Sequence, residues 1–312
     1  MKANIHYLFI LCLLILGSCK NGNASSQSKN ETPQDTIKAI KMPAIPQMMT
    51  APEQRADFLA KHYWDNVNFA DTNYIHHPEV TEQAWADYCD LLNHVPLETA
   101  QQAMRNVIDR TNVDKKMFTY ITDLADKYLY DPNSPMRNEE FYIPVLEAMI
   151  ASPVLNETEK IRPQARLKLA QKNRIGTKAL NFTYTLASGA QGTLYQLKAE
   201  YLLLFINNPG CQACTETIEG LKNAPVINQL LQEKKLVLLS IYPDEELDEW
   251  KKHLSEFPNE WINGYDKKFT IKEEQVYDLK AIPTLYLLDK DKTVLLKDAT
   301  APAIEAYLMQ HQ

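Results

Sequence analysis

Two cysteines stand three residues apart, Cys211 and Cys214, shortly after an apolar stretch of the chain. That stretch reads YLLLFI from Tyr201 to Ile206 and is typical of a β-strand buried on both faces. Asn-Asn-Pro-Gly interrupts it, and the polar segment that opens with the cysteines reads as a helix. Such a pair is a redox couple, half of a metal site, or a feature of a binding fold without chemistry. The sequence therefore predicts a strand–loop–helix unit whose function depends on two sulfur atoms.

The first residues predict an exported protein. One basic residue, Lys2, precedes an apolar core that is short for a membrane span and typical of a signal peptide. The letters LGSC, which end at Cys19, resemble the lipobox of bacterial lipoproteins. This resemblance implies removal of residues 1–18 and lipidation of Cys19, while an ordinary secretory signal is the alternative. We expect a protein of the bacterial cell envelope, anchored to the membrane by lipid on Cys19 and facing the periplasm.

Residues 19–50 are expected to form a flexible tether, because 20–36 are polar, rich in Ser and Asn and free of aromatic residues. The formal net charge of the full sequence is −7, and it becomes −8 once Lys2 leaves with the signal peptide. This acidic balance without a basic cluster argues against nucleic acid and anionic lipid as partners. With only five cysteines, the chain is also not a small fold held together by disulfides.

The length of the mature chain, about 290 residues, exceeds the usual size of a single core and predicts two domains. Residues 51–171 read as helical throughout. In TEQAWADYCDLLNHV, for example, the large apolar residues recur at helical spacing, and Cys89 beside them is expected to be a small buried side chain. Prolines such as Pro144 and Pro163 are expected to separate the helices.

From residue 177 onward, strands alternate with helices, and the chain ends in a hairpin and a helix. This order predicts an α/β domain over 177–312, with a mixed central sheet flanked by helices and preceded by the all-α domain. The segment KKFTIKEEQVYDLK, residues 267–280, is expected to be helical. Asp244 is expected to cap the helix that follows it.

Residues 177–312 resemble the thioredoxin fold, in the branch of membrane-anchored proteins similar to TlpA and ResA. Two motifs carry the resemblance. One is the strand–loop–Cys-x-x-Cys–helix unit, and the other is LKAIPTLYLLDKD, which resembles the Ile-Pro-Thr segment before the final hairpin of that fold. The helical half resembles an uncharacterised domain that precedes thioredoxin-like domains in lipoproteins of the Bacteroidota. That second resemblance implies no activity.

The spacing of the two cysteines suits a dithiol that exchanges disulfides. At the first turn of a helix, unpaired N–H groups and the helix dipole favour a thiolate on Cys211. Cys214 lies one turn further on the same face, close enough to form a disulfide with Cys211. We therefore expect Cys211 to be the nucleophile and Cys214 to resolve the mixed disulfide. The expected partners are protein or small-molecule thiols and disulfides and a membrane-bound electron donor, without a cofactor.

The resemblance also implies a role for Pro283. It implies that the Ile282–Pro283 peptide bond is cis and that Pro283 takes part in catalysis beside the cysteines. The backbone of Ile282 would pair with an extended peptide substrate. With Gly210 and Thr284, Ile282 would form the substrate-binding surface.

The sequence departs from the thioredoxin pattern at three places. Gly210 stands where thioredoxins usually carry Trp, and Gln212-Ala213 separates the cysteines. Thioredoxins also bury an acid in the preceding strand, where this chain has Phe205. Without that acid, proton removal from Cys214 is expected to be slower near neutral pH.

Two other interpretations of the cysteine pair remain to be weighed. A structural zinc ion needs two further Cys or His at suitable spacing, whereas His253 and His311 stand alone, so we expect no metal. The alternative function is a binding or scaffold lipoprotein of thioredoxin fold with a non-catalytic or vestigial disulfide.

Overall fold

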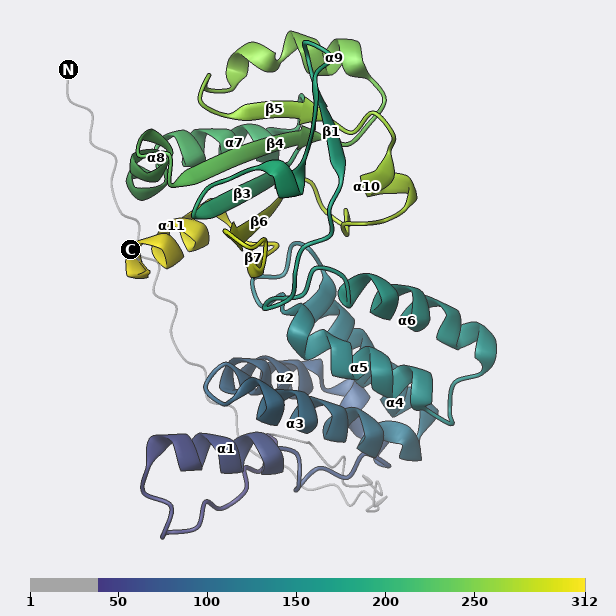
Figure 1. Ribbon diagram of the computed structural model, residues 1–312. Coiled ribbons are helices and arrows are strands. Elements are labelled where there is room, and N and C mark those ends of the chain that lie inside the picture. The colour runs from purple at the N-terminus through teal and green to yellow at the C-terminus, as the bar shows by residue number, and fades with distance from the viewer. Residues whose placement is uncertain (1–38, 312) are drawn as a thin grey trace, which may run out of the picture. The chain divides into compact units, whose positions relative to one another are not determined.

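The computed structural model describes residues 39–311. The predicted signal peptide, Cys19 and the first part of the predicted tether lie outside the described residues. Within 39–311, no helix has both the length and the apolar character that crossing a bilayer requires. A helical half, residues 51–171, is joined by a connecting segment, residues 172–176, to a sheet half, residues 177–311 (Figure 1).

The last part of the predicted tether lies against the folded protein. Ile40 packs on the core of the helical half. The side-chain amide of Asn66 donates a hydrogen bond to the Lys41 carbonyl at 2.9 Å. The prediction of a flexible tether is therefore wrong for residues 39–50, because an apolar side chain and a side-chain donor fix a segment whose composition differs from that of 20–36.

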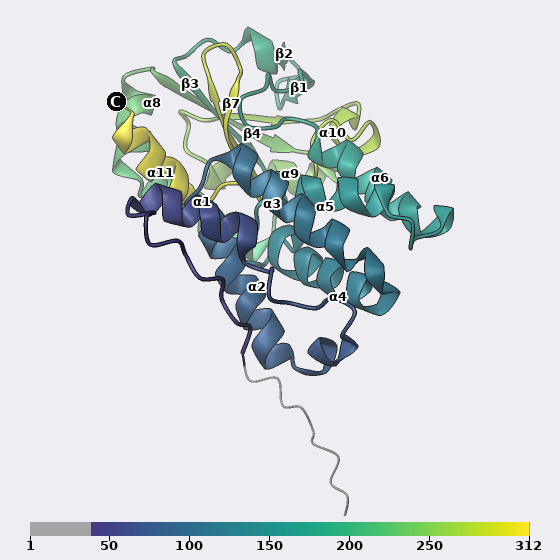
Figure 2. The same cartoon turned by 90° about the horizontal axis from the view of Figure 1, so that it is seen from below.

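The described part of the helical half contains six α-helices. They are α1 (Pro52–His62), α2 (Pro78–Leu92), α3 (Leu97–Arg110), α4 (Lys115–Ala125), α5 (Glu139–Ala151) and α6 (Glu157–Ala170). Side chains cap three of them: Asp114, Asn138 and Asn156 accept hydrogen bonds from first-turn N–H groups of α4, α5 and α6. Helix α5 packs against both α3 and α6 (Figure 2).

Pro144 and Pro163 lie inside α5 and α6, so the prediction that they separate helices is wrong. A proline has no N–H, and Pro144 therefore leaves the carbonyl of Glu140, one turn earlier, without its helical donor. Gln101 on α3 donates its side-chain amide to this carbonyl at 3.0 Å. A residue distant in the sequence thus supplies the hydrogen bond that the proline removes.

Aromatic rings fill the core of the helical half. Trp85 and Tyr88 on α2 are fully buried, and the Trp64 ring lies 6.0 Å from that of Trp85 and 5.6 Å from that of Tyr88. Cys89 is buried in the same core, and burial raises the pKa of its thiol to about 12. The interpretation of Cys89 as a small buried side chain is confirmed.

The sheet half is built on a mixed sheet of seven strands in the order β2-β1-β5-β4-β3-β6-β7. Strands β3, β4 and β5 are parallel to one another, and the other pairs are antiparallel. The strands are β1 (Thr183–Leu186), β2 (Gln191–Thr193), β3 (Tyr201–Ile206), β4 (Leu236–Tyr242), β5 (Ile262–Tyr265), β6 (Thr284–Asp289) and β7 (Val294–Lys297). The helices are α7 (Gln212–Lys222), α8 (Pro225–Gln232), α9 (Leu247–Lys252), α10 (Thr270–Glu273) and α11 (Ala301–Gln310).

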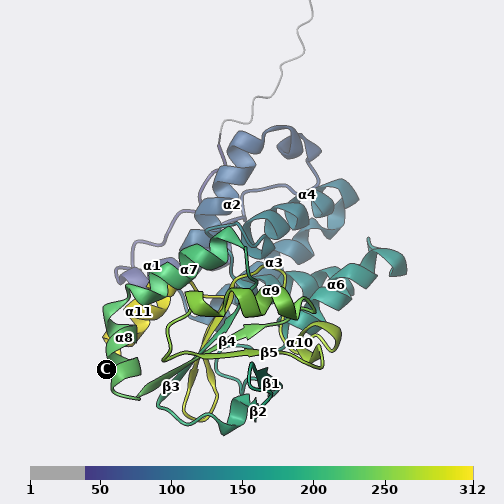
Figure 3. The ribbon, with the colours of Figure 1, turned by 90° about the horizontal axis from the view of Figure 1, so that it is seen from above.

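Strand β3 shows why both faces of the sheet are covered. Its side chains alternate between the faces, as in any strand. Leu203 and Phe205 face the core formed with α7, α8 and α11, which lie together in Figure 3. Leu202 and Leu204 belong to the core on the other face, which includes Ile271 of α10. The predicted architecture, a mixed sheet flanked by helices and preceded by an all-α half, is confirmed.

Helix α10 is much shorter than predicted. It covers Thr270–Glu273, and a loop over 274–283 then leads to β6. The prediction of a helix over 267–280 is therefore wrong. Lys172 and Asn173 of the connecting segment donate side-chain hydrogen bonds to backbone carbonyls of this loop. Hydrogen bonds to a distant part of the chain thus replace those of a helix.

Candidate functional site

The site begins where β3 ends and α7 begins. The loop 207–210 closes with Gly210, whose φ of +70° lies in the left-handed region that favours glycine. Cys211 follows as the N-cap residue of α7, and its sulfur accepts a hydrogen bond from the backbone N–H of Cys214 at 3.4 Å. The sulfur of Cys211 thus takes the place of the oxygen of a capping serine or aspartate and lies at the positive end of the helix dipole.

The two cysteines differ in exposure. Cys211 is half-buried, whereas Cys214 is 2% exposed on the inner side of α7. Burial, together with a hydrogen bond to Cys211, raises the pKa of the Cys214 thiol to about 12, and the backbone of Asn208 acts in the opposite direction. A substrate can therefore reach the sulfur of Cys211, while Cys214 lies beneath it.

The second segment of the site is the start of β6. The Ile282–Pro283 peptide bond is cis, and the Cys211 thiol donates a hydrogen bond to the Ile282 carbonyl over a sulfur–oxygen distance of 3.8 Å. The fold thus brings Cys211, Cys214, Ile282 and Pro283 together, although about 70 residues separate the two segments.

Thr284 has a different position from the one that the sequence analysis implies. It is 4% exposed, and its hydroxyl donates a hydrogen bond to the Ala281 carbonyl at 2.5 Å. Its backbone pairs with Ile206 at the end of β3. Thr284 therefore holds the loop over residues 274–283, here called the prolyl loop, against β3, and its side chain faces this loop and not the solvent.

Models of two known families match this chain, one in each half. A family model described as thioredoxin-like matches residues 199–294, and a model described as a domain of unknown function (DUF5106) matches residues 18–173. The crystal structure of a thioredoxin-like protein from Bacteroides caccae is 83% identical, with a match that covers 89% of this chain and 100% of that chain at a TM-score of 0.86. This chain belongs to the same thioredoxin-like family. The suspected relationship is confirmed.

Two further solved structures match less than half of the thioredoxin-like chain. The C-terminal domain of an uncharacterized protein from Bacteroides fragilis is 71% identical and covers 44% of this chain and 98% of that chain, with a TM-score of 0.43. The thioredoxin domain of a thiol-disulfide oxidoreductase from Bacteroides vulgatus is 19% identical and covers 44% and 97%, with a TM-score of 0.40. No curated protein matches this chain.

The departures from the thioredoxin pattern have visible structural consequences. A tryptophan in place of Gly210 would be strained, because its φ is positive. Phe205, where thioredoxins carry an acid, is fully buried and packs edge-on against Trp261 at 6.4 Å between ring centroids. The thioredoxin-like site therefore presents an apolar ring at the position of the usual proton acceptor.

The sequence analysis missed a group of three bonded polar side chains beside the cysteines. The side-chain amide of Asn208 donates to the Asp244 carboxylate at 3.0 Å, and Lys272 pairs with the other oxygen of Asp244 at 2.8 Å. The side-chain oxygen of Asn208 (Oδ1) is buried and has no hydrogen-bond partner within the described part of the chain. A usable signal existed, because β3 and β4 are parallel and residues just after neighbouring parallel strands meet at one edge.

The prediction that Asp244 caps a helix is wrong. Helix α9 begins at Leu247, and its N-cap residue, Glu246, makes no side-chain capping bond. Asp244 instead faces Asn208 and Lys272, because the chain turns from the end of β4 toward the cysteine loop. Among residues 39–311, no group of three or more His, Cys, Asp or Glu side chains has the arrangement of a metal site.

Proposed function

We propose that this thioredoxin-like protein is a thiol–disulfide oxidoreductase of the bacterial cell envelope, anchored by lipid on Cys19. The observation that carries the proposal is the position of the Cys211 sulfur. It lies half-buried at the start of α7, within hydrogen-bond distance of the Cys214 N–H and of the Ile282 carbonyl. A thiol placed at a helix N-terminus and open to solvent is suited to attack a disulfide.

The exchange transfers two electrons through two steps. The thiolate of Cys211 attacks one sulfur of a substrate disulfide, forms a mixed disulfide and releases the other substrate sulfur as a thiolate, which takes up a proton. Cys214 then loses its proton and attacks the sulfur of Cys211, which releases the second substrate thiol and leaves a Cys211–Cys214 disulfide. A dithiol donor reduces this disulfide again, and the same steps run in reverse when the partner has the lower reduction potential.

The prolyl loop supplies a place for the polypeptide around the substrate disulfide. An extended peptide binds to exposed backbone groups by main-chain hydrogen bonds, and such bonds give affinity without requiring a particular sequence. Ile282 is half-buried beside Cys211 and offers its backbone at this place. The proposed substrates are therefore disulfides of exported polypeptides, and the proposed donor is a membrane-bound dithiol.

Substitution of the two cysteines tests the proposal. Cys211→Ser removes the attacking sulfur, and turnover of a peptide disulfide with dithiothreitol as the donor should fall to the uncatalysed rate. Cys214→Ser leaves the first step intact, and the mixed disulfide on Cys211 should accumulate, because nothing within the site resolves it. Mass spectrometry of the trapped adduct and the absorbance change of the released thiol are the measurements.

The competing function is a binding or scaffold protein with a cysteine pair that does not turn over. Under that function the wild-type protein gives no exchange above background, and Cys214→Ser traps no adduct. Either result would remove the oxidoreductase from consideration. Cys89→Ser is the matched control, because this buried thiol lies in the helical core and the exchange kinetics should not depend on it.

A further inference from the structure

The loop that carries Ile282 and Pro283 is held by residues of the connecting segment and of the helical half. Lys172 of the connecting segment donates to the carbonyls of Glu274, at 3.2 Å, and Gln275, at 2.6 Å. Asn173 donates its side-chain amide to the carbonyl of Val276 at 2.7 Å. The prolyl loop covers residues 274–283. The carbonyls of its first three residues thus accept hydrogen bonds from side chains that directly follow the helical half.

A buried lysine holds the second half of the loop. Lys280 stands two residues before Ile282, and its side chain is 9% exposed. Its ammonium group lies 3.1 Å from Glu139, 3.1 Å from Asp278 and 3.4 Å from Asp298. Asp278 and Asp298 belong to the sheet half, whereas Glu139 is the first residue of α5 in the helical half.

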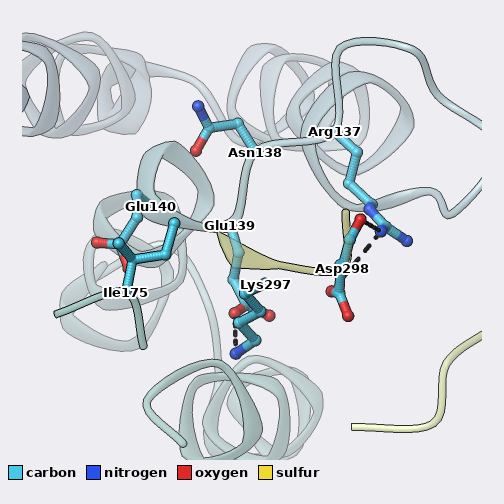
Figure 4. Close-up of a pocket in the computed structure, with 7 residues that line it drawn as sticks. All are labelled: Arg137, Asn138, Glu139, Glu140, Ile175, Lys297 and Asp298. Atoms are coloured by element: carbon cyan, nitrogen blue, oxygen red, sulfur yellow. Dashed lines mark hydrogen bonds and ion pairs between the residues drawn. The ribbon is translucent and has the colours of Figure 1, made fainter. Parts of the chain in front are cut away.

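Glu139 joins two lysines of the sheet half. Its second carboxylate oxygen pairs with Lys297 at the end of β7, and Figure 4 shows this pair beside the bond from Arg137 to Asp298. Arg137 donates to the Asp298 carbonyl at 2.7 Å. The start of α5 therefore contacts the end of β7 and the prolyl loop through charged groups that are mostly buried.

The charges in this cluster balance when Glu139 is present. Three carboxylates, those of Glu139, Asp278 and Asp298, face three cations, Arg137, Lys280 and Lys297. Burial disfavours the charge on Lys280, but the surrounding carboxylates outweigh burial and raise its pKa above the ordinary value. Loss of Glu139 would leave an excess of buried positive charge, and such charge is costly enough to displace the residues that carry it.

Space for such a displacement exists beside the cluster. A cavity of about 280 Å³ is lined by Lys280 together with Tyr130, Asp278 and residues of α6, α10 and the prolyl loop. A lysine released from Glu139 can turn into this space and regain water. The prolyl loop would follow, because Lys280 is part of it.

We propose that Glu139 is a positioning residue for disulfide exchange: through Lys280 it holds the prolyl loop so that the Ile282 backbone meets the substrate beside Cys211. This inference rests on the proposed function and assigns a role to the helical half. The thioredoxin-like half carries the sulfur chemistry, and the helical half completes the surface that receives the polypeptide. Displacement of a positioning group by about 1 Å can cost on the order of a hundredfold in rate.

Glu139→Gln in the full chain is the direct test, because it keeps the shape of the side chain and removes its charge. We expect KM for a synthetic peptide disulfide to rise roughly tenfold, since the loop that receives the peptide is displaced. Reaction with a small aromatic disulfide should change by less than about twofold, because such a molecule meets Cys211 without using the loop. Unequal effects on the two substrates are the signature of positioning.

Glu140→Gln is the matched control. Glu140 is the next residue of α5, but its carboxylate bonds to Arg174 and Gln101 and not to the prolyl loop. The kinetic constants of the Glu140→Gln protein for both disulfides should equal those of the wild type. A second variant, Lys280→Met, fills a similar volume without the charge and should raise KM for the peptide as Glu139→Gln does.

The double variant Glu139→Gln/Lys280→Met completes the cycle. If Glu139 acts through Lys280, the double variant has the same KM as Lys280→Met alone, whereas independent effects would multiply. A folded Glu139→Gln protein with wild-type KM for the peptide would overturn the inference. If that variant does not fold, a wild-type KM in Lys280→Met would do so. Failure of the proposed function is distinct, because the wild-type protein would then exchange neither disulfide.

Discussion

Cys214 must lose a proton before it can resolve the mixed disulfide, and its surroundings oppose that step. Burial raises the pKa of its thiol to about 12. The strand behind it presents the Phe205 ring where thioredoxins have an acid, so no carboxylate of β3 can accept the proton. The proton is expected to pass to solvent or to the departing substrate thiolate, and the second step is therefore expected to be slower than the first.

The pH dependence of the second step follows from this thiol. The pKa of the Cys214 thiol is about 12. At pH values below this pKa, the thiolate fraction rises about tenfold for each pH unit, and the rate of resolution rises with it. Single-turnover release of the second substrate thiol between pH 7 and pH 9 should therefore accelerate by roughly a hundredfold. A rate that levels off near pH 7 would contradict the expectation and would indicate a nearby proton acceptor. The matched measurement on Cys214→Ser should show no second release at any pH.

At the scale of elements, Asn173 fixes three segments with one side chain. It follows α6, is 3% exposed and has a φ of +50°. Its amide donates to Val276 in the prolyl loop, and its side-chain oxygen accepts from the N–H of Leu180 at 2.7 Å. Asn173 therefore connects the end of the helical half to the start of the sheet half and to the prolyl loop.

Substitutions of Asn173 separate its hydrogen bonds from its backbone conformation. Asn173→Gly keeps the left-handed conformation without strain but loses both hydrogen bonds, and should cost about 2 kcal/mol of the free energy of unfolding. Asn173→Ala adds the strain of a left-handed residue with a Cβ atom and should cost about 1 kcal/mol more. Urea unfolding followed by circular dichroism measures both values. Equal costs for the two variants would show that the conformation contributes nothing.

At the scale of the whole molecule, the charge cluster links the stability of the two halves. Breaking a buried ion pair by removing one partner costs about 3–5 kcal/mol. If either half unfolded first, the other half would lose the ion pairs of Glu139 with Lys280 and Lys297 and the hydrogen bond from Arg137 to Asp298. The two halves should therefore unfold together, although each has its own hydrophobic core.

Tryptophan fluorescence can report each half separately. Trp64 and Trp85 lie in the helical half, and Trp250 and Trp261 lie in the sheet half. With either pair replaced by Phe, the urea midpoint from the remaining fluorescence should coincide with that from far-ultraviolet circular dichroism. The added change Glu139→Gln should separate the two midpoints, and Glu140→Gln should not. Separate midpoints without any change in the cluster would show that the halves are independent.

Much of the sheet half could be predicted from the sequence because its signals are local. A continuous apolar run predicts β3, and the Asn-Asn-Pro-Gly interruption marks its end and the start of α7 at the cysteines. The resemblance to the thioredoxin fold supplied the cis Ile282–Pro283 bond, which the residues alone would not have indicated. These features depend on neighbours a few residues away or on a motif of fixed order.

The errors have a common cause in distant partners. Residues 274–280 have a helical composition. Lys172 and Asn173, however, donate hydrogen bonds to carbonyls that would accept backbone N–H groups in a helix. Pro144 is tolerated within α5 because the Gln101 side-chain amide donates a hydrogen bond to the Glu140 carbonyl, which the proline leaves without a donor. Local spacing contains no information about either donor.

The sequence by itself determined the cysteine pair, the strand and helix that present it, and the division into a helical and a sheet half. Only the tertiary structure decided which charge each buried lysine meets, as Lys280 and Glu139 are 141 residues apart in the chain. The reason is physical: periodicity records whether a side chain is buried, whereas the partner of a buried charge depends on how distant elements pack.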